Sequence, residues 1–252
     1  MFLHGTGATA QWADEETGLS LLAGREGFTL VLPEGLRPNP DAPTKFLTNP
    51  QRWNDGSQLT PAGLCTTDDV GFLAAVIDDV RGRARVDDRR VYVTGFSNGA
   101  SMAFRLATEL AGRIAAIAPL AGYCWMDDPR PVRPIPTLYT IGSLDPLVPI
   151  RGGDVRSPWQ HRYIRRPPLV DTLDRWARAI SCEVPSRMES DTGPVRTDIY
   201  PGPVPFRVMT VDGLGHHWPG GKGGLNHRIA GPPLTSIDGS AIVWEFLKRH
   251  SL

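Results

Sequence analysis

Short apolar runs alternate along this chain of 252 residues with segments whose apolar residues recur at helical spacing. Runs rich in β-branched and aromatic residues predict strands at 28–32, 91–95, 114–120, 137–142 and 206–213. Helical spacing predicts helices over 68–80, 98–111, 169–180 and 236–249. Because this alternation is typical of βαβ units, we expect an α/β fold with a mostly parallel central sheet flanked by helices.

Composition and loop positions limit the domain organisation and the partners. Lys and Arg number 27 against 27 Asp and Glu, and no basic run exceeds two residues, so we expect no nucleic-acid partner. No apolar window reaches the roughly 18 residues of a membrane span, and the N-terminus lacks the pattern of a signal peptide. Pro and Gly cluster in predicted surface loops, with no repeat or linker between them, so we expect one domain over residues 1–252; the loops are 33–63, 129–136, 152–168 and 201–205.

The start of the chain is unusual for such a fold. The opening MFLHGTG leaves three residues for a strand before a glycine turn, whereas a strand usually has about five or six. Either the true start lies upstream, so that the amino-terminal strands of the sheet are truncated, or the sheet begins abnormally.

A serine between two glycines follows the predicted strand at 91–95. The stretch Gly95-Phe96-Ser97-Asn98-Gly99 matches the G-x-S-x-G pattern, with a strand before it and a helix-forming run after it. Glycines are needed there because side chains at both positions would collide with neighbouring backbone in so tight a turn. The context predicts a nucleophilic serine, Ser97, rather than a helix cap.

A serine nucleophile needs a base that is held in place by an acid. In this type of fold the acid follows the serine in the sequence, and the histidine base follows the acid. His216 and His217 come directly after the strand at 206–213, so either is a candidate base, whereas the other four histidines are poorly placed: His4, His161, His227 and His250. Asp145 follows the strand at 137–142 and is the expected acid, with three rivals in neighbouring loops: Asp127, Asp128 and Asp154.

An acyl-transfer site also needs hydrogen-bond donors for the oxyanion. The backbone amide of Asn98, just after the serine, is one expected donor, and Thr6 in the turn His4-Gly5-Thr6-Gly7 is the other. His4 then braces this turn and is not the base.

Other kinds of site are not indicated. Lys222 in GGKGG lacks the spacing of a phosphate-binding loop, and adjacent His216 and His217 do not suit one metal, so we expect no cofactor and no metal. Three cysteines lack metal or redox spacing and are expected to be packing residues, or one disulfide and a spare thiol.

Several motifs together resemble the poly(3-hydroxybutyrate) depolymerase and feruloyl esterase group of α/β-hydrolases, including related actinobacterial esterases. They are LHGTG, RWNDG at 52–56, DDVGFLAAVIDDV at 68–80, DDRRVYVTGFSNG at 87–99, DPLVPIRGG at 145–153 and GHHWPGG at 215–221. The resemblance implies an α/β-hydrolase fold and ester hydrolysis, with Ser97 as nucleophile, Asp145 as acid and His216 as base. It also favours a secreted location.

This chain departs from the family at several points. The family usually has Gly-Gly-Met after the serine, where this chain has Gly99-Ala100-Ser101-Met102, and the usual partner of Cys182 is missing. Relatives also carry apolar residues before the LHG turn, which favours the truncated start. With no room for a polymer-binding domain, we expect soluble hydroxyalkanoate oligomers, feruloyl or aryl esters, or short acyl esters as substrates. Trp218, Trp53 and His217 are the expected substrate-binding residues, and Trp125 and Trp159 are further candidates to line the cleft.

These observations favour a serine esterase that forms an acyl-enzyme. A peptidase or acyltransferase on the same fold is the alternative within enzymes. A different class also remains open, a non-catalytic hydrolase-fold protein or one inactivated by truncation.

Overall fold

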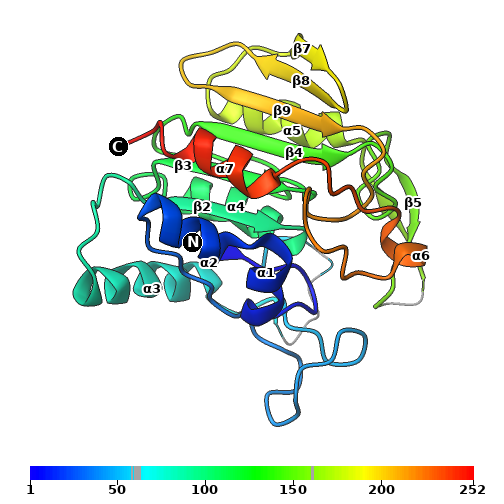
Figure 1. Cartoon of the computed structure of the whole chain (residues 1–252), viewed down its shortest axis with the longest axis horizontal. Helices are drawn as coiled ribbons and strands as arrows, with labels where there is room; N and C mark the ends of the chain where they lie inside the picture. Colours follow the sequence, from blue (N-terminus) through cyan, green and yellow to red (C-terminus); the bar gives the residue numbers. More distant parts are fainter. Residues whose placement is uncertain (58, 60–63, 160–161) are drawn as a thin grey trace.

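The computed structural model describes residues 1–57, 59, 64–159 and 162–252, and a seven-stranded sheet runs through its centre (Figure 1). The first five strands in the sheet are parallel and the last two are antiparallel. The predicted α/β fold with a mostly parallel sheet is therefore confirmed. In spatial order the strands are β1 (Phe2–Leu3), β2 (Tyr92–Phe96), β3 (Ala116–Leu120), β4 (Thr137–Gly142), β9 (Phe206–Val211), β8 (Val195–Tyr200) and β7 (Arg187–Thr192).

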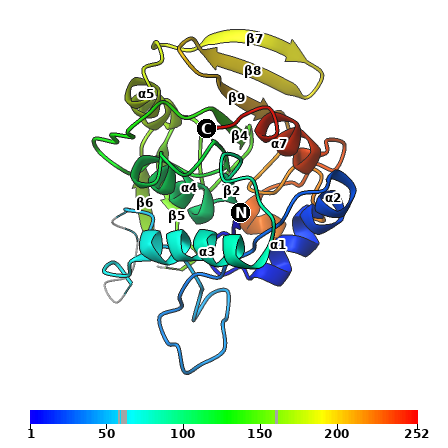
Figure 2. The ribbon, with the colours of Figure 1, turned by 90° about the vertical axis from the view of Figure 1, so that its left-hand side faces the viewer.

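Helices cover both faces of this sheet. One face carries α3, α4 and α5, and the other carries α2 and α7 (Figure 2). The four predicted helices are present as α3, α4, α5 and α7, while α1, α2 and α6 are additions. The bounds are α1 (Ala10–Thr17), α2 (Leu19–Glu26), α3 (Asp69–Arg83), α4 (Asn98–Glu109), α5 (Leu169–Ala179), α6 (His227–Ala230) and α7 (Gly239–Leu247).

The core lies between the sheet and these helices. Every residue of β3 and β4 is buried, as expected for parallel strands with helices on both faces. Phe104 of α4 packs edge-on against Trp176 of α5, with ring centroids 5.3 Å apart. The Trp176 indole N–H donates to the Thr137 hydroxyl at 3.0 Å, so the buried indole keeps a hydrogen-bond partner.

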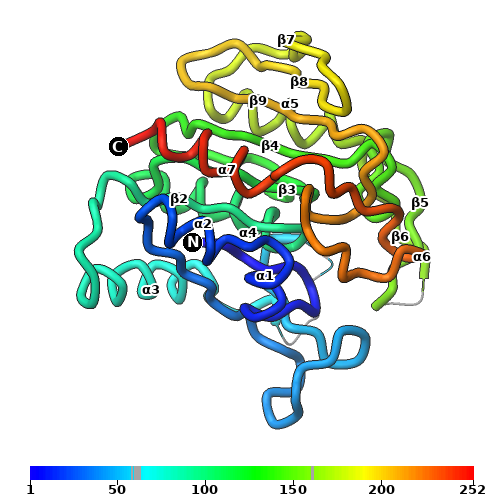
Figure 3. The backbone as a smooth tube through the Cα atoms, viewed as in Figure 1, coloured from blue at the N-terminus to red at the C-terminus, as the bar shows by residue number. Residues whose placement is uncertain are grey.

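The amino-terminal region differs from the expectation. Residues 28–32 form no strand, although the Phe2 N–H donates to the Val31 carbonyl at 2.9 Å. The segment thus runs beside the two-residue strand β1 but forms no strand ladder with it. This part of the backbone follows the sheet edge as extended chain (Figure 3).

Two antiparallel hairpins lie in segments that periodicity did not identify. The predicted loop 152–168 contains β5 (Gly153–Arg156) paired with β6 (Tyr163–Arg166). The second hairpin joins β7 to β8 at Gly193, whose φ of 60° suits glycine. All six residues of β7 are exposed, so this edge strand lacks the apolar face that makes a strand visible in a sequence.

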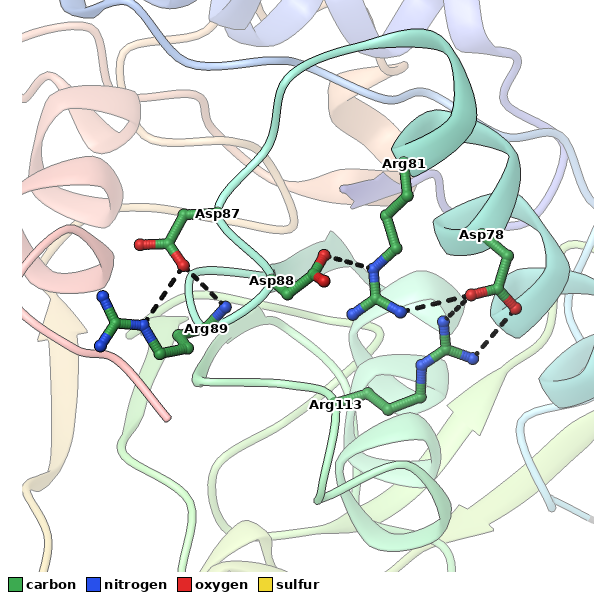
Figure 4. Close-up of polar contacts among 6 residues, drawn as sticks. All are labelled: Asp78, Arg81, Asp87, Asp88, Arg89 and Arg113. Carbon is green, nitrogen blue, oxygen red and sulfur yellow. Dashed lines mark hydrogen bonds and ion pairs between the residues drawn. The ribbon is translucent and has the colours of Figure 1, made fainter.

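Charged side chains link α3 to two neighbouring turns at the surface (Figure 4). Asp78 of α3 pairs with Arg81 and with Arg113, and Arg81 also pairs with Asp88, before β2. Exposed pairs of this kind contribute about 0–1 kcal/mol each. The position of α3 therefore depends mainly on its buried residues, such as Leu73 and Ile77.

Two cysteines are packing residues, as the sequence suggested. Cys124 and Cys182 are buried free thiols, and burial raises the pKa of the Cys124 thiol to about 12. A thiol with so high a pKa is unreactive at neutral pH.

Among the described residues, no helix is long and apolar enough to cross a bilayer.

Replacing Phe104 by Ala should lower the free energy of unfolding by about 3–5 kcal/mol, because the fully buried ring would leave a cavity. Urea unfolding followed by circular dichroism measures the change. Phe72→Ala is the matched control: Phe72 of α3 is 44% exposed, so its loss should be about 1 kcal/mol or less. Equal losses in the two variants would contradict the placement of Phe104 in the core.

Candidate active site

Ser97 lies at the sharp turn between β2 and α4, with a φ of 56° and a ψ of −119°. Such a conformation costs a non-glycine residue about 1–3 kcal/mol and is concentrated at functional sites. The flanking glycines are required by close contact. A Cβ on Gly95 would lie 2.5 Å from the Gly99 carbonyl oxygen, and one on Gly99 would lie 2.0 Å from that of Leu3.

The structure brings Ser97, His216 and Asp145 into one hydrogen-bonded chain. The Ser97 Oγ and His216 Nε2 atoms are 2.9 Å apart, and His216 Nδ1 is 2.7 Å from Asp145 Oδ2. With the proton on Nδ1, His216 donates to Asp145 and accepts from the serine hydroxyl. The His216 side chain is 3% exposed and that of Asp145 is fully buried, so little water competes for these bonds.

Strand ends position the two partners of the serine. Asp145 follows β4 and His216 follows β9, and these strands are adjacent and parallel, with Gly142 opposite Val211. Asp145 Oδ1 accepts the N–H groups of Leu147 and Val148, both at 2.8 Å, which fixes the carboxylate. Its other oxygen is thereby aimed at the imidazole.

The rival residues lie elsewhere. Asp128 pairs with Arg130 and Asp154 with Arg165, and all four side chains are at least 62% exposed. His161 lies outside the described residues.

Two backbone amides beside Ser97 are free to donate. Neither the Thr6 N–H nor the Asn98 N–H has a hydrogen-bond acceptor among the described residues, whereas the next amide, Gly7 N–H, donates to the Gln51 carbonyl at 2.7 Å. Thr6 and Asn98 therefore have the free donors that an oxyanion requires.

His4 braces the turn that carries Thr6. Its Nδ1–H donates to the Gly5 carbonyl at 2.8 Å, and its Nε2 accepts the Gly35 N–H at 3.0 Å. Burial lowers the pKa of His4, which favours the neutral ring that these two bonds require. His4 thus lies in a structural position and does not contact Ser97 as a base would.

The Asn98 side chain ties the serine turn to the segment Trp53–Asp55. It accepts the Trp53 N–H at 2.7 Å and donates to Asp55 Oδ2 at 2.7 Å. The Trp53 indole in turn donates to the His4 carbonyl at 3.0 Å. This connection could not be read from the sequence, because the paired residues lie 45 positions apart and carry no local pattern.

Two hollows meet at Ser97. The apolar cleft, about 410 Å³, contains Ser97 and His216 and is walled by Trp12, Phe46, Phe96, Trp159, Leu225 and Ile229. The polar cavity, about 60 Å³, contains Ser97 and Asn98 and is walled by Arg52, Asp55, Ser101, Tyr123, Trp125 and Arg166.

Three expected substrate-binding residues lie away from both hollows. Trp53 is fully buried behind the serine turn, and Trp218 packs on Phe2 and donates to the Ser240 hydroxyl at 3.0 Å. His217 is 1% exposed and its Nε2–H donates to the Gly231 carbonyl. None of the three lines either hollow, so these positions correct our expectation. Of the tryptophans considered, Trp125 and Trp159 line the hollows.

No group of three or more His, Cys, Asp or Glu side chains suited to a metal ion occurs in the part of the chain that the structure describes.

Comparison with known families identifies the chain. The family model described as "Esterase PHB depolymerase" matches residues 1–151, more than half of the sequence. The chain belongs to this family. The esterase is also 31% identical, over 98% of its length and 73% of the relative's, to the protein provisionally named esterase NocK of Nocardia uniformis subsp. tsuyamanensis. It is therefore a carboxylic ester hydrolase, as the resemblance implied.

Other relatives agree with this class. Feruloyl esterase B of Piromyces equi is 29% identical to this chain over 80% of the chain's length. The match spans only 34% of the longer feruloyl esterase. The acetyl xylan esterase from Aspergillus awamori has a similar fold, with a TM-score of 0.59, 16% identity, and coverage of 86% of this chain and 82% of the other. The predicted α/β-hydrolase fold is thus confirmed.

Replacing Asn98 by Ala should destabilise the esterase by about 1–3 kcal/mol, because the buried Trp53 N–H and Asp55 carboxylate would lose their partner. Urea unfolding measures this change. The matched control is Asn39→Ala, where the side chain is exposed and accepts only the exposed Asp41 N–H at 3.0 Å, so that the change in stability should be about 0.5 kcal/mol or less. A stability unchanged in the Asn98 variant would contradict the described connection.

Proposed function

We propose that this esterase hydrolyses its substrates through an acyl-enzyme on Ser97, with His216 as base and Asp145 as the acid that orients it. The hydrogen-bonded chain from Ser97 Oγ through His216 to Asp145 Oδ2 carries this proposal. It has the connectivity that activates a serine hydroxyl, which is otherwise a poor nucleophile at neutral pH.

In the first half-reaction, Ser97 Oγ attacks the ester carbonyl while its proton passes to His216 Nε2. The carbonyl oxygen becomes an oxyanion, which accepts hydrogen bonds from the Thr6 and Asn98 amides; each such donor contributes about 3–4 kcal/mol. His216 then protonates the alcohol oxygen as it leaves. In the second half-reaction, a water molecule gives a proton to His216 as its oxygen attacks the acyl carbon. His216 then returns the proton to Ser97 Oγ as the acid leaves.

The proton donor decides which hollow receives which part of the ester. The leaving oxygen must approach His216 Nε2, and His216 lines the apolar cleft but not the polar cavity. We therefore place the alcohol in the apolar cleft and the acyl group towards the polar cavity. The aromatic walls of the cleft, Trp12, Phe46 and Trp159, favour aryl or short apolar alcohols.

We further propose that residues 1–252 act as one catalytic domain on soluble esters, among them aryl, short acyl and hydroxyalkanoate oligomer esters. One continuous cluster of buried apolar residues supports this unit, since it includes Phe2 of β1 and Leu247 of α7.

Replacing Ser97 by Ala should lower kcat for a chromogenic short-chain aryl ester by roughly 10⁴-fold or more, because no other nucleophile replaces the hydroxyl. Spectrophotometry of the released alcohol measures this effect. A fluorophosphonate should add one label per protein, located on Ser97 by mass spectrometry. The matched control is Ser20→Ala on the exposed side of α2, which should keep full activity. Equal rates in wild type and Ser97→Ala would overturn the proposal.

Replacing Asp145 by Asn should lower kcat by about 10⁴-fold while the protein stays folded, because the amide no longer holds the imidazole in the required tautomer. Asp128→Asn is the control at a rival acidic residue and should leave kcat unchanged, since its exposed side chain pairs with Arg130. A larger loss in the Asp128 variant than in the Asp145 variant would refute the assignment.

A further inference from the structure

The polar cavity contains a concentration of buried polar atoms without partners. Apart from Arg81 Nε, which pairs with Asp88, the described part of the chain has six buried side-chain nitrogen or oxygen atoms with no hydrogen-bond partner, and four of them belong to residues lining this cavity. These four are Arg52 Nε, Ser57 Oγ, Tyr123 Oη and Arg166 Nε. Three of the residues are almost enclosed, with Arg52 9%, Ser57 8% and Tyr123 2% exposed.

Unpartnered buried polar groups destabilise a protein unless something else satisfies them. Arginine Nε can only donate a hydrogen bond. Burial raises the pKa of Tyr123, so its phenol stays protonated and can donate as well. The free groups around this cavity therefore suit an acceptor-rich ligand.

The charges around the cavity point to an anion. Arg52 and Arg166 form no ion pair among the described residues, and Asp55 is the one carboxylate among the described residues that line the cavity. The Asp55 oxygens already accept the Asn98 side-chain N–H and the Ser57 N–H. Two guanidinium groups thus line the cavity against one carboxylate. The other carboxylate that acts on Arg166 is Asp145, whose oxygens are already occupied by His216 and two backbone N–H groups. Burying guanidinium groups without a directly bound counter-ion is unfavourable.

Neighbouring rings hold one of the two guanidinium groups in place. The Arg166 Cζ atom lies 5.8 Å from the centre of the Tyr123 ring and 5.6 Å from that of Trp125. Contacts of this kind orient the planar cation and keep it beside the cavity without neutralising it. A guanidinium so placed can bind a carboxylate through two parallel hydrogen bonds.

The size of the cavity limits the ligand. One buried water molecule needs roughly 10–15 Å³ of cavity volume, so a cavity of about 60 Å³ holds about four or five non-hydrogen atoms. This is the size of a carboxylate with one or two methylene groups. The cavity is also continuous with Ser97 on the side assigned above to the acyl group.

Resting on the Ser97 mechanism proposed above, we infer that the polar cavity binds a free carboxylate at the end of a short acyl group. The preferred substrates are then half-esters of short dicarboxylic acids, of the malonic or succinic type, with an apolar alcohol. Hydrolysis of such a half-ester by water releases the diacid and the alcohol. Arg52, Arg166 and Tyr123 are the residues that determine this specificity.

A pair of substrates that differ in charge tests this inference. We would measure kcat/KM for monobenzyl succinate and for its neutral analogue, benzyl methyl succinate, by chromatography of the released benzyl alcohol. Wild type should prefer the charged ester by tenfold or more. In Arg52→Gln and Arg166→Gln, kcat/KM for the charged ester should fall by tenfold or more while that for the neutral ester changes less than threefold.

Two further variants control for folding and for general charge effects. Tyr123→Phe removes only the hydroxyl and should reduce the preference with the fold intact. Arg165→Gln, next to Arg166 but with a side chain that is 79% exposed, should leave both rates unchanged. A wild-type preference for the neutral ester, or equal losses for both esters in the Arg variants, would overturn the inference.

Calorimetry with succinate separates failure of the inference from failure of the proposed mechanism. Succinate should bind Ser97→Ala and lose affinity by tenfold or more on adding Arg52→Gln. Butyrate, which lacks the second carboxylate, should bind at least tenfold more weakly. If neither ester is hydrolysed but succinate binds in this manner, the mechanism fails and the anion site stands. If Ser97-dependent hydrolysis is observed without such binding, the anion site fails alone.

Discussion

The close approach of two backbone segments is the constraint on which the site depends. The turn after β1 lies so near the start of α4 that only a hydrogen atom fits at Gly99, beside the carbonyl groups of Leu3 and His4. The same approach brings the turn that carries Thr6 against Ser97, since a Cβ on Gly5 would lie 3.2 Å from the Ser97 Cβ. The hydrogen bonds made by His4, Trp53 and the Asn98 side chain hold the two segments at this separation. In the proposed mechanism, the turns that carry the Thr6 and Asn98 amides are thus held in place before a substrate enters.

The parallel core of the fold could be predicted from the sequence, because its strands are buried on both faces. β3 and β4 are continuous apolar runs, and α4 and α5 follow helical periodicity. The exposed β7 and the short β1 could not be predicted in this way. A strand without a buried face carries no alternation of apolar residues, and a strand of two residues is too short to show any pattern.

The residues of the candidate site also differ in whether their positions could be predicted from the sequence. Ser97, Asp145 and His216 each follow a recognisable strand, so their meeting at one edge of the sheet could be foreseen. The positions of Trp218 and His217 could not, since adjacency in sequence to His216 says nothing about which way a side chain packs. Trp53 is far in sequence from all three residues, and no local pattern indicated that it packs behind the serine turn.

The meeting of the two arginines in the polar cavity could not be predicted either, because they lie far apart in the sequence and only the fold brings them together. The one local signal was Ala100-Ser101, where the chain departs from its family. Ser101 lines this cavity, and its hydroxyl accepts the Tyr123 N–H at 3.0 Å.

The hairpin at the edge of the sheet has a practical consequence. β7 is charged and fully exposed, and it is separated by β8 from β9, which leads to His216. Charges of this kind protect a free edge from pairing with another chain. The Gly193 turn lies at the same edge of the sheet as His216, because Val195 pairs with Val211. The loop 201–205, which joins β8 to β9 at the opposite edge, is therefore the better anchoring point. A protein tethered to a solid support or to a fusion partner there would keep the entrance to Ser97 open.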